Sequence, residues 1–280
     1  MTNSALILDL DNTLYSWMDS YAPALQATIT YLAKELRLPV PTIKESFKRV
    51  FQSHKSVEVV NSVIELDIWR NTVVCEEKKN EVQSNAQSLF FEVFKNNLHL
   101  FPDVERVLLW AKEKGIMLIA FSDARAYWAD FRLSALNLYQ YFDSIFVLMD
   151  EALPNTVLKP YPSSVIQYST KQRKPNPELL LEILHASGVF SKQVYVIGDS
   201  KRKDILPASK LGLPSVWAKY GANYSSSSKR LVGAVTPWSA SQRAGGGNIK
   251  PHYTIDSFSD IINILEENMK EVEECSSTWV

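Results

Sequence analysis

Three short apolar segments of this chain lead into acidic residues, and they restrict the possible folds more than any other feature. The segments are residues 5–8, 116–121 and 193–197. Apolar runs of this length are typical of strands buried on both faces, and helical patterns such as 104–111 and 177–186 lie between the later segments. This alternation predicts a parallel sheet covered by helices on both faces.

The polar residues that follow these segments are expected to meet in space. They are Asp9 and Asp11, Ser122 and Asp123, and Asp199. In an open parallel sheet the ligand lies beyond the carboxyl ends of the strands. On an extended segment Asp9 and Asp11 point to the same side, where their like charges need a cation or a shared proton. Taken alone, the acidic pair is equally compatible with a solvated strand end.

A long helical region separates the first predicted strand from the others. Residues 21–36 carry apolar side chains at steps of three and four, and Pro39 and Pro41 prevent the helix from continuing. Residues 42–100 are also mostly helical in pattern, without strand and helix alternation. We therefore expect a helical insertion in a discontinuous α/β core. The predicted core is residues 1–14 and 101–280, and the predicted insertion is residues 15–100.

The composition excludes several classes of function. The 280 residues are 46% hydrophobic and 22% charged with a formal net charge of −1, so no overall basic field favours nucleic acid or anionic membranes. Cys75 and Cys275 form no metal-ligand spacing and no disulfide framework. No apolar segment is long enough to span a bilayer. These features predict a cytoplasmic protein without nucleic-acid or membrane partners, and they indicate no oligomeric state.

Two segments do not fit the alternation of strands and helices. Residues 150–173 read as a long irregular connection, and residues 221–250 contain "SSSS" and "AGGGN", which indicate a flexible excursion. We expect both to be surface loops, because insertions in loops are tolerated at little cost.

The last predicted strand is followed by a second group of candidate site residues. In "GDSKRKD", Gly198 is expected to allow a sharp turn, Asp199 lies at the strand tip, and Asp204 follows one helical turn later. Asp204 is also in a position to cap a helix, which is compatible with a second role.

A lysine near these acids is expected to offset their repulsion. Lys174 in "KPNP" is preferred over Lys159 in the similar "LKPYP", because one helix and one strand connect Lys174 directly to Asp199. A solvated surface lysine is the default alternative. Ser122, at the tip of its strand, is positioned to donate its hydroxyl and backbone N–H to a phosphate oxygen, or else to form a simple turn.

Together these residues resemble a known family. The segments "DLDNTL", "FSD", "KPNP" and "GDSKRKD" resemble, in order, placement and spacing, the four motifs of the haloacid dehalogenase superfamily. The helical insertion after the first motif is similar to the helical cap of that superfamily. The resemblance implies an α/β fold with a three-layer Rossmann-like core and an inserted helical cap.

The resemblance also implies a role for each candidate. Asp9 is expected to be the nucleophile that forms an aspartyl-phosphate, and Asp11 the general acid and then base. Mg²⁺ is expected to be held by Asp9, Asp199 and the backbone carbonyl of Asp11, with Asp204 as a nearby acid. Ser122 and Lys174 are expected to stabilise the charge of the phosphoryl oxygens.

Asp11 favours phosphoryl transfer over dehalogenation. The dehalogenases of this superfamily lack an acid at this position because a halide leaves without a proton, whereas an alkoxide must be protonated. The sequence departs from many relatives at residues 122–124, Ser-Asp-Ala, where Thr/Ser-Asn-Gly is usual. The additional acid, Asp123, is expected either to weaken phosphate binding or to face away.

The predicted function is Mg²⁺-dependent hydrolysis of a small phosphomonoester. Nucleotide monophosphates, phosphoglycolate and sugar phosphates are all candidate substrates, and "DNTLY" is similar to nucleotidases of the superfamily. A phosphomutase on the same scaffold and a non-catalytic binding module remain as alternatives.

Specificity is expected to come from the cap. Tyr15, Trp17, Asp19 and Arg70 are the candidate cap residues, with packing against the core as the more ordinary role for Trp17.

Overall fold

A computed structural model describes residues 4–70, 75–150, 160–189, 193–237 and 248–277. Its strands are β1 (Ser4–Leu8), β2 (Met117–Arg125), β3 (Ser144–Leu148), β4 (Val165–Tyr168), β5 (Gln193–Gly198), β6 (Ser215–Ala218) and β7 (Tyr253–Ile255). Its α-helices are α1 (Trp17–Leu36), α2 (Val40–His54), α3 (Glu76–Asn96), α4 (Val104–Glu113), α5 (Ala126–Ala135), α6 (Pro177–Ala186), α7 (Leu206–Lys210), α8 (Ser226–Val235) and α10 (Asp260–Ser277). The short helical turns used below are η1 (Asp67–Arg70) and η4, a π-helical turn over Lys201–Ile205.

The strands form one parallel sheet whose order creates a single reversal point. The order is β4-β3-β2-β1-β5-β6-β7, and all of its pairings are parallel. After β1 the chain builds the sheet outward through β2, β3 and β4, and it then returns to place β5 on the other side of β1. The crevice between the carboxyl ends of β1 and β5 is therefore the topological switch point, where open α/β sheets bind their ligands.

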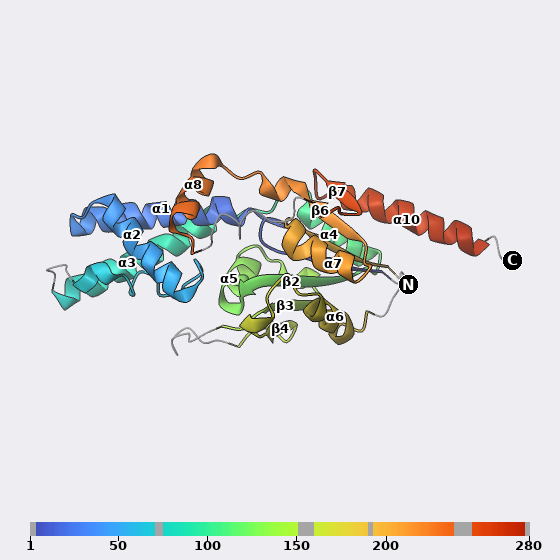
Figure 1. Ribbon diagram of the computed structural model, residues 1–280, viewed down its shortest axis with the longest axis horizontal. Helices are drawn as coiled ribbons and strands as arrows, with labels where there is room; N and C mark the ends of the chain where they lie inside the picture. Colours follow the sequence, from blue (N-terminus) through green and yellow to red (C-terminus); the bar gives the residue numbers. More distant parts are fainter. Residues whose placement is uncertain (1–3, 71–74, 151–159, 190–192, 238–247, 278–280) are drawn as a thin grey trace.

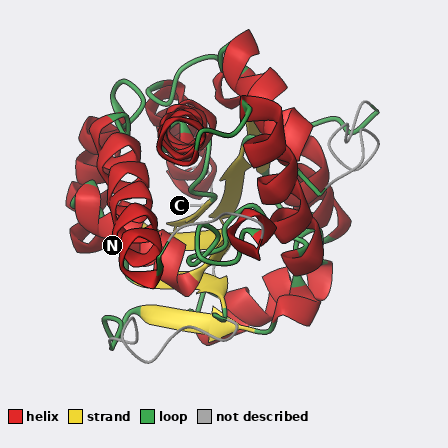
Figure 2. Cartoon of the chain, turned by 90° about the vertical axis from the view of Figure 1, so that its left-hand side faces the viewer, coloured by secondary structure: helices red, strands yellow, loops and turns green. Residues whose placement is uncertain are grey.

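Helices cover both faces of the sheet, as Figure 2 shows. Alternate residues of β1 separate the two apolar layers: Leu6 and Leu8 pack with residues of α4, α5 and α10, whereas Ala5 and Ile7 pack with residues of α6 and α7. A strand with apolar side chains on both faces is the pattern of a central parallel strand. The predicted three-layer α/β fold is confirmed.

The helical cap lies at one end of the molecule, at the left of Figure 1, and consists of α1, α2, η1 and α3 with their connections. Ser16 begins α1 by accepting a hydrogen bond from the backbone N–H of Asp19. Pro39 immediately precedes α2, and Pro41 occupies its first turn, where a missing N–H costs nothing. The exact boundaries of 15–100 stay a prediction. Within the described residues, no helix combines the length and apolarity needed to cross a membrane.

Both segments expected to be loops contain regular structure. Residues 150–173 include the edge strand β4, which pairs with β3, so the expectation of an irregular connection was wrong there. A four-residue strand with two exposed side chains gives little periodic signal. Residues 151–159 lie outside the described residues.

The segment 221–250, expected to be a flexible loop, contains α8, which covers part of the cap surface. Ser225 caps the helix, so the serine run is a helix start rather than a linker. Helix α8 packs against α1 and α2, beside the cap in Figure 1. Asp19 Oδ1 accepts hydrogen bonds from the backbone N–H of Ser225 (3.1 Å) and the hydroxyl of Ser228 (2.7 Å). Residues 238–247 lie outside the described part of the chain.

Candidate active site

Asp9 and Asp199 lie side by side at the switch point. Asp9 follows β1, and its backbone N–H donates to the carbonyl of Ile197 on β5 (2.9 Å). Thr13, which is fully buried, ties the two strand ends together: its hydroxyl donates to Asp9 Oδ2 (3.3 Å) and accepts from the backbone N–H of Asp199 (3.0 Å). Of the strand ends expected to converge, those that carry Asp9 and Asp199 therefore meet.

Asp204 reaches the same place from η4. Its Oδ2 accepts from the backbone N–H of Ser200 (3.1 Å), while the Ser200 hydroxyl accepts from the backbone N–H of Lys203 (3.2 Å). This reciprocal arrangement resembles a capping box in which Ser200, not Asp204 as expected, is the N-cap residue, and Asp204 supports it from inside η4. Gly198 has a different role from the expected sharp turn: a Cβ at this position would collide with the Asp204 side chain.

Lys174 lies between two of the acids. Its Nζ contacts Asp9 Oδ1 at 2.8 Å and Asp204 Oδ1 at 2.7 Å, and its side chain is 2% exposed. Burial disfavours the charged ammonium, but the Asp204 and Asp9 carboxylates raise the pKa of Lys174 above its ordinary value. The ammonium also lies 4.3 Å from the ring centre of Phe121. The alternative lysine, Lys159, lies outside the described residues.

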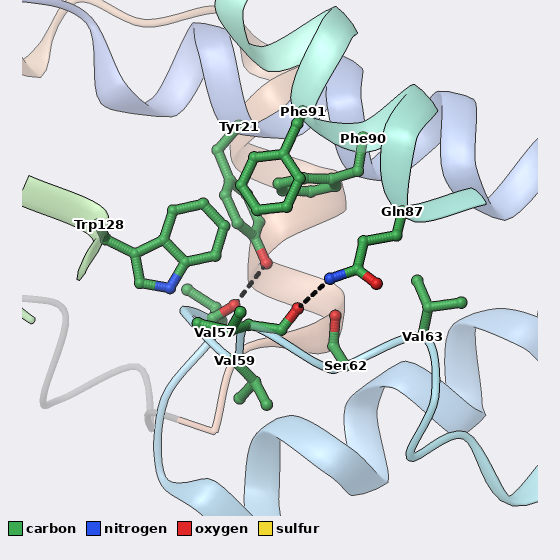
Figure 3. Close-up of a pocket in the computed structure, with 10 residues that line it drawn as sticks. Tyr21, Val57, Val59, Ser62, Val63, Gln87, Phe90, Phe91 and Trp128 are labelled. Atoms are coloured by element: carbon green, nitrogen blue, oxygen red, sulfur yellow. Dashed lines mark hydrogen bonds between the residues drawn. The ribbon is translucent and has the colours of Figure 1, made fainter. Parts of the chain in front are cut away.

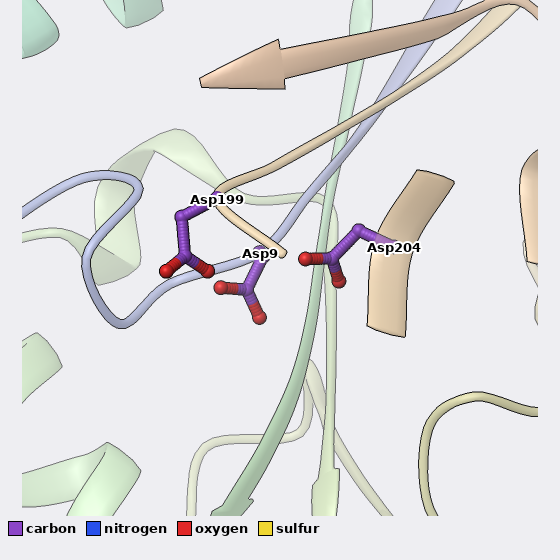
Figure 4. A group of neighbouring side chains, drawn as sticks. All are labelled: Asp9, Asp199 and Asp204. Atoms are coloured by element: carbon purple, nitrogen blue, oxygen red, sulfur yellow. The ribbon is translucent and has the colours of Figure 1, made fainter. Parts of the chain in front are cut away.

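The three carboxylates of Asp9, Asp199 and Asp204 form a cluster that fits a divalent cation. One oxygen from each lies within 4.8 Å of the others, and Figure 4 shows them turned toward one another. Burial and the carboxylates of its two neighbours raise the pKa of Asp199 well above its ordinary range. Burial likewise raises the pKa of Asp204 to about 6 despite Lys174. The single positive charge of Lys174 therefore does not balance the three carboxylates. Carboxylate oxygens are ligands that suit Mg²⁺, which would supply the missing positive charge.

Ser122 and Asp123 lie in an irregular part of β2, where the pairing with β3 shifts register between Phe121 and Arg125. Such a bulge changes the direction of the side chains near the end of the strand. The Ser122 hydroxyl accepts from the backbone N–H of Ala124 (3.1 Å), and its carbonyl accepts from the Tyr168 hydroxyl (2.7 Å). Ser122 is therefore fixed within the bulge.

The departure at Asp123 is compensated locally. Its carboxylate pairs with Lys203 Nζ (3.0 Å) and accepts from the backbone N–H of Lys174 (3.0 Å). Although burial opposes ionisation, the Lys203 and Lys174 charges lower the pKa of Asp123 below its ordinary value. Asp123 thus anchors the backbone of Lys174.

The carboxylate of Asp11 lies outside the acidic cluster. Its two oxygens face Arg132 of α5, with Nε at 3.2 Å from Oδ1 and Nη2 at 3.2 Å from Oδ2. Burial is the main cause that raises the pKa of Asp11 to about 7; Arg132 opposes the shift, and Glu58 and Asp9 add to it. The structure gives no ligand role to this carboxylate, and the backbone carbonyl of Asp11 as a metal ligand stays a prediction.

Two residues near Asp11 were missed from the sequence. Arg132 has no exposed surface, and its Nη1 contacts Glu58 Oε1 at 2.5 Å. A signal was present: Arg132 is four residues after Trp128, so it lies on the same buried stripe of α5, where an arginine needs an anionic partner. Glu58, in the irregular connection after α2, carried no signal in the sequence.

The structure gives contacts for three of the candidate cap residues and leaves the fourth at the surface. Tyr15 is buried beside Asp11, and Asp19 holds α8 as described. Trp17 stacks on Tyr21 of the same helix with ring centres 4.9 Å apart, a contact inside the cap and not the packing against the core that was expected. Arg70 is exposed at the end of η1. A specificity role for any of them stays a prediction.

A small, mostly apolar pocket lies where the cap meets α5 (Figure 3). The Tyr21 hydroxyl donates to the carbonyl of Val57 (2.7 Å) and the Gln87 amide donates to the carbonyl of Val60 (3.2 Å), which fixes the connection after α2 against α1 and α3. Trp128 closes the pocket from the core side. The cap is therefore held against the core by side chains from both.

Family models of known hydrolases match most of the chain. A family model for haloacid dehalogenase-like hydrolases matches residues 4–212, and a related hydrolase model matches residues 172–261. Phosphoglycolate phosphatase of Escherichia coli (strain K12) is 27% identical over 152 residues, 54% of this chain and 52% of that protein. Phosphoglycolate phosphatase of Pasteurella multocida is 28% identical over 167 residues, 60% of this chain and 58% of that protein. The chain spans about half the length of these curated relatives.

Solved structures share the fold. A 2-haloacid dehalogenase from Pseudomonas syringae superposes with a TM-score of 0.59 at 16% identity, covering 94% of this chain and 98% of that one. A HAD phosphatase from Thermococcus onnurineus superposes with a TM-score of 0.55 at 17% identity, covering 94% and 97%. At these identities the likeness establishes the architecture alone. With the family match over residues 4–212, the chain belongs to the haloacid dehalogenase-like hydrolases.

Proposed function

We propose that this protein hydrolyses a small phosphomonoester in a Mg²⁺-dependent reaction that passes through an aspartyl-phosphate at Asp9. The observation that carries the proposal is the cluster of Asp9, Asp199 and Asp204 around Lys174 at the switch point. A bound cation and the Lys174 ammonium would both place positive charge beside Asp9. This charge suits a phosphate dianion, because its negative charge must be neutralised before a carboxylate can approach it.

Each of the proposed site residues has a defined task in this reaction. Asp9 Oδ2, on the side away from Lys174, attacks phosphorus, and the bond from phosphorus to the leaving oxygen breaks. The Lys174 ammonium, together with the hydroxyl or backbone N–H of Ser122, stabilises the charge on the equatorial oxygens. Mg²⁺ held by Asp9 and Asp199, with Asp204 close by, would supply further charge neutralisation and orient the phosphate.

Asp11 supports an ester rather than a halide as the substrate. An alkoxide leaving group needs a proton, and Asp11 is the acid two residues from the nucleophile with a pKa raised to about 7. The same carboxylate then takes a proton from the water that attacks phosphorus, the bond between phosphorus and the Asp9 oxygen breaks, and inorganic phosphate leaves. A halide leaving group would make no use of this residue.

Phosphoglycolate is the first substrate to test, because the curated relatives named above are phosphoglycolate phosphatases. Nucleotide monophosphates and sugar phosphates complete the panel. Release of inorganic phosphate supports a phosphatase, whereas isomerisation of a sugar phosphate without phosphate release supports a mutase. No turnover of any ester with Mg²⁺ present supports a binding module.

The decisive variant is Asp9→Asn. We expect phosphate release to fall by at least about 1,000-fold, because the amide oxygen is a poor nucleophile, while the melting temperature changes little. Removal of divalent cations with EDTA should abolish native activity, and Mg²⁺ should restore it. Asp256→Asn, at an exposed ion pair with Lys219, is the matched control and should keep native turnover. Near-native turnover by Asp9→Asn would exclude Asp9 as the nucleophile.

A further inference from the structure

A fully buried arginine joins the cap to Asp11. Arg132 has no exposed surface and is among the largest fully buried side chains. Its guanidinium contacts both oxygens of Asp11 on one side and Glu58 on the other. Nη2 donates a hydrogen bond to Asp11 Oδ2, and Nε lies 3.2 Å from Oδ1 as an ion-pair contact, so the guanidinium holds the carboxylate from one side.

Glu58 is held in place by the cap. Its Oε1 also accepts a hydrogen bond from the Trp17 indole at 3.2 Å, and its neighbours Val57 and Val59 line the pocket between the cap and α5. The Glu58 side chain is only 12% exposed. The carboxylate of Asp11 is therefore linked to a cap residue, Glu58, by contacts with a single core residue, Arg132.

Stability does not explain this arrangement well. Buried charges lose their hydration, and replacing a buried ion cluster with apolar side chains is often neutral or stabilising. What a charged cluster supplies instead is directional contact with one carboxylate.

We propose that Arg132 and Glu58 are positioning residues for Asp11, which set the direction of its carboxylate when the cap lies against the core. The inference rests on the proposed function, because it assigns Asp11 the task of protonating the leaving oxygen. Neither residue touches the acidic cluster through any contact recorded among the described residues, so they act on the reaction through Asp11.

Leaving-group dependence tests this role. An alkyl phosphate needs a well-placed acid, whereas p-nitrophenyl phosphate releases an anion that is stable without a proton. For Glu58→Gln, which keeps the shape and an acceptor for Trp17, we expect kcat/KM for an alkyl phosphate, which reports formation of the aspartyl-phosphate and not its hydrolysis, to fall by about 10- to 100-fold. The value of kcat/KM for p-nitrophenyl phosphate should change by less than about threefold. Glu65→Gln, in the same connection but paired with His54 at the surface, is the matched control and should match the native enzyme on both substrates.

Three outcomes would overturn the inference. Equal losses on both substrates would indicate a general structural defect, and no loss on either would remove Glu58 from the mechanism. A rise in kcat/KM would mean that the cluster holds Asp11 away from the leaving oxygen. The double variant Asp11→Asn/Glu58→Gln should be no slower on the alkyl phosphate than Asp11→Asn alone; multiplied losses would show that the two residues act independently.

A second measurement separates this inference from the proposed function. In urea unfolding, Asp11→Asn and Glu58→Gln should show coupled changes in the free energy of unfolding, because both remove anions from one guanidinium. This coupling does not depend on turnover. If the native protein hydrolyses no ester, the proposed function fails; if the two changes simply add, the positioning cluster fails.

Discussion

At the scale of single residues, the site is governed by the balance between anions and cations. Lys174 is buried between Asp9 and Asp204, and Lys203 compensates Asp123 from a half-exposed position. The buried lysine is the only one of the two in contact with the predicted nucleophile, so its charge has the larger effect on a phosphate that arrives there.

Replacing Lys174 tests this balance directly. Lys174→Met keeps most of the side-chain volume and removes the charge, so kcat/KM for the best phosphate ester should fall by about 100-fold or more. Steady-state phosphate release checks the result. Lys171→Met, at an exposed position three residues earlier, should behave as the native protein. A loss of less than about threefold in Lys174→Met would show that this ammonium does not contact the reacting phosphate.

At the scale of elements, the site depends on how closely η4 approaches the end of β5. Gly198 ends β5, and the Asp204 side chain occupies the space that a Cβ at this position would take. The same side chain closes the start of η4 through Ser200. One glycine thus allows the strand end, the helix start and the acidic cluster to share a small volume.

Gly198→Ala should therefore displace Asp204. We expect the free energy of unfolding to fall by about 1–3 kcal/mol, as for other overpacked positions, and turnover to fall with it. Urea denaturation and phosphate release measure the two effects. In Gly233→Ala the new methyl group meets no atom within 4 Å and lies inside α8, so that variant should be as stable as the native protein or slightly more stable. Equal stability of Gly198→Ala and the native chain would refute the close approach.

At the scale of the whole molecule, segments from both ends of the chain complete one core. Strand β1 lies at the centre of the sheet, and α10 packs on the same face as α4 and α5 through Ile261 and Leu265. The cap interrupts this core between β1 and α4, and α8 returns from the C-terminal half to pack on the cap. The core and cap are therefore stabilised by contacts between residues distant in sequence.

Leu265→Ala tests the contribution of α10. The side chain is 2% exposed, so its loss should lower the free energy of unfolding by about 2–5 kcal/mol. Leu109→Ala, half exposed on α4, should change it by no more than about 0.5 kcal/mol. Urea unfolding curves compare the two variants. Similar effects for both would show that α10 adds little to the core.

The sequence by itself determined the parallel α/β fold and its helical cap. Apolar strands with acidic ends predicted that Asp9 and Asp199 would meet, but the Asp11 carboxylate expected beside them faces Arg132 instead. The connection through one helix and one strand selected Lys174, which contacts Asp9. These features are readable because they depend on local periodicity and on the general rule that parallel strands end at the same edge.

Only the tertiary structure decided the partners of Asp11, the packing of α8 on the cap and the need for glycine at position 198. Arg132 and Glu58 are 74 residues apart in the sequence, and Asp19 and Ser228 are 209 residues apart. Strand β4 could not be recognised from the sequence, because a short edge strand with exposed side chains resembles a loop in its composition. Contacts of this kind depend on how the cap, helices and sheet pack in space, and no local pattern of residues encodes that packing.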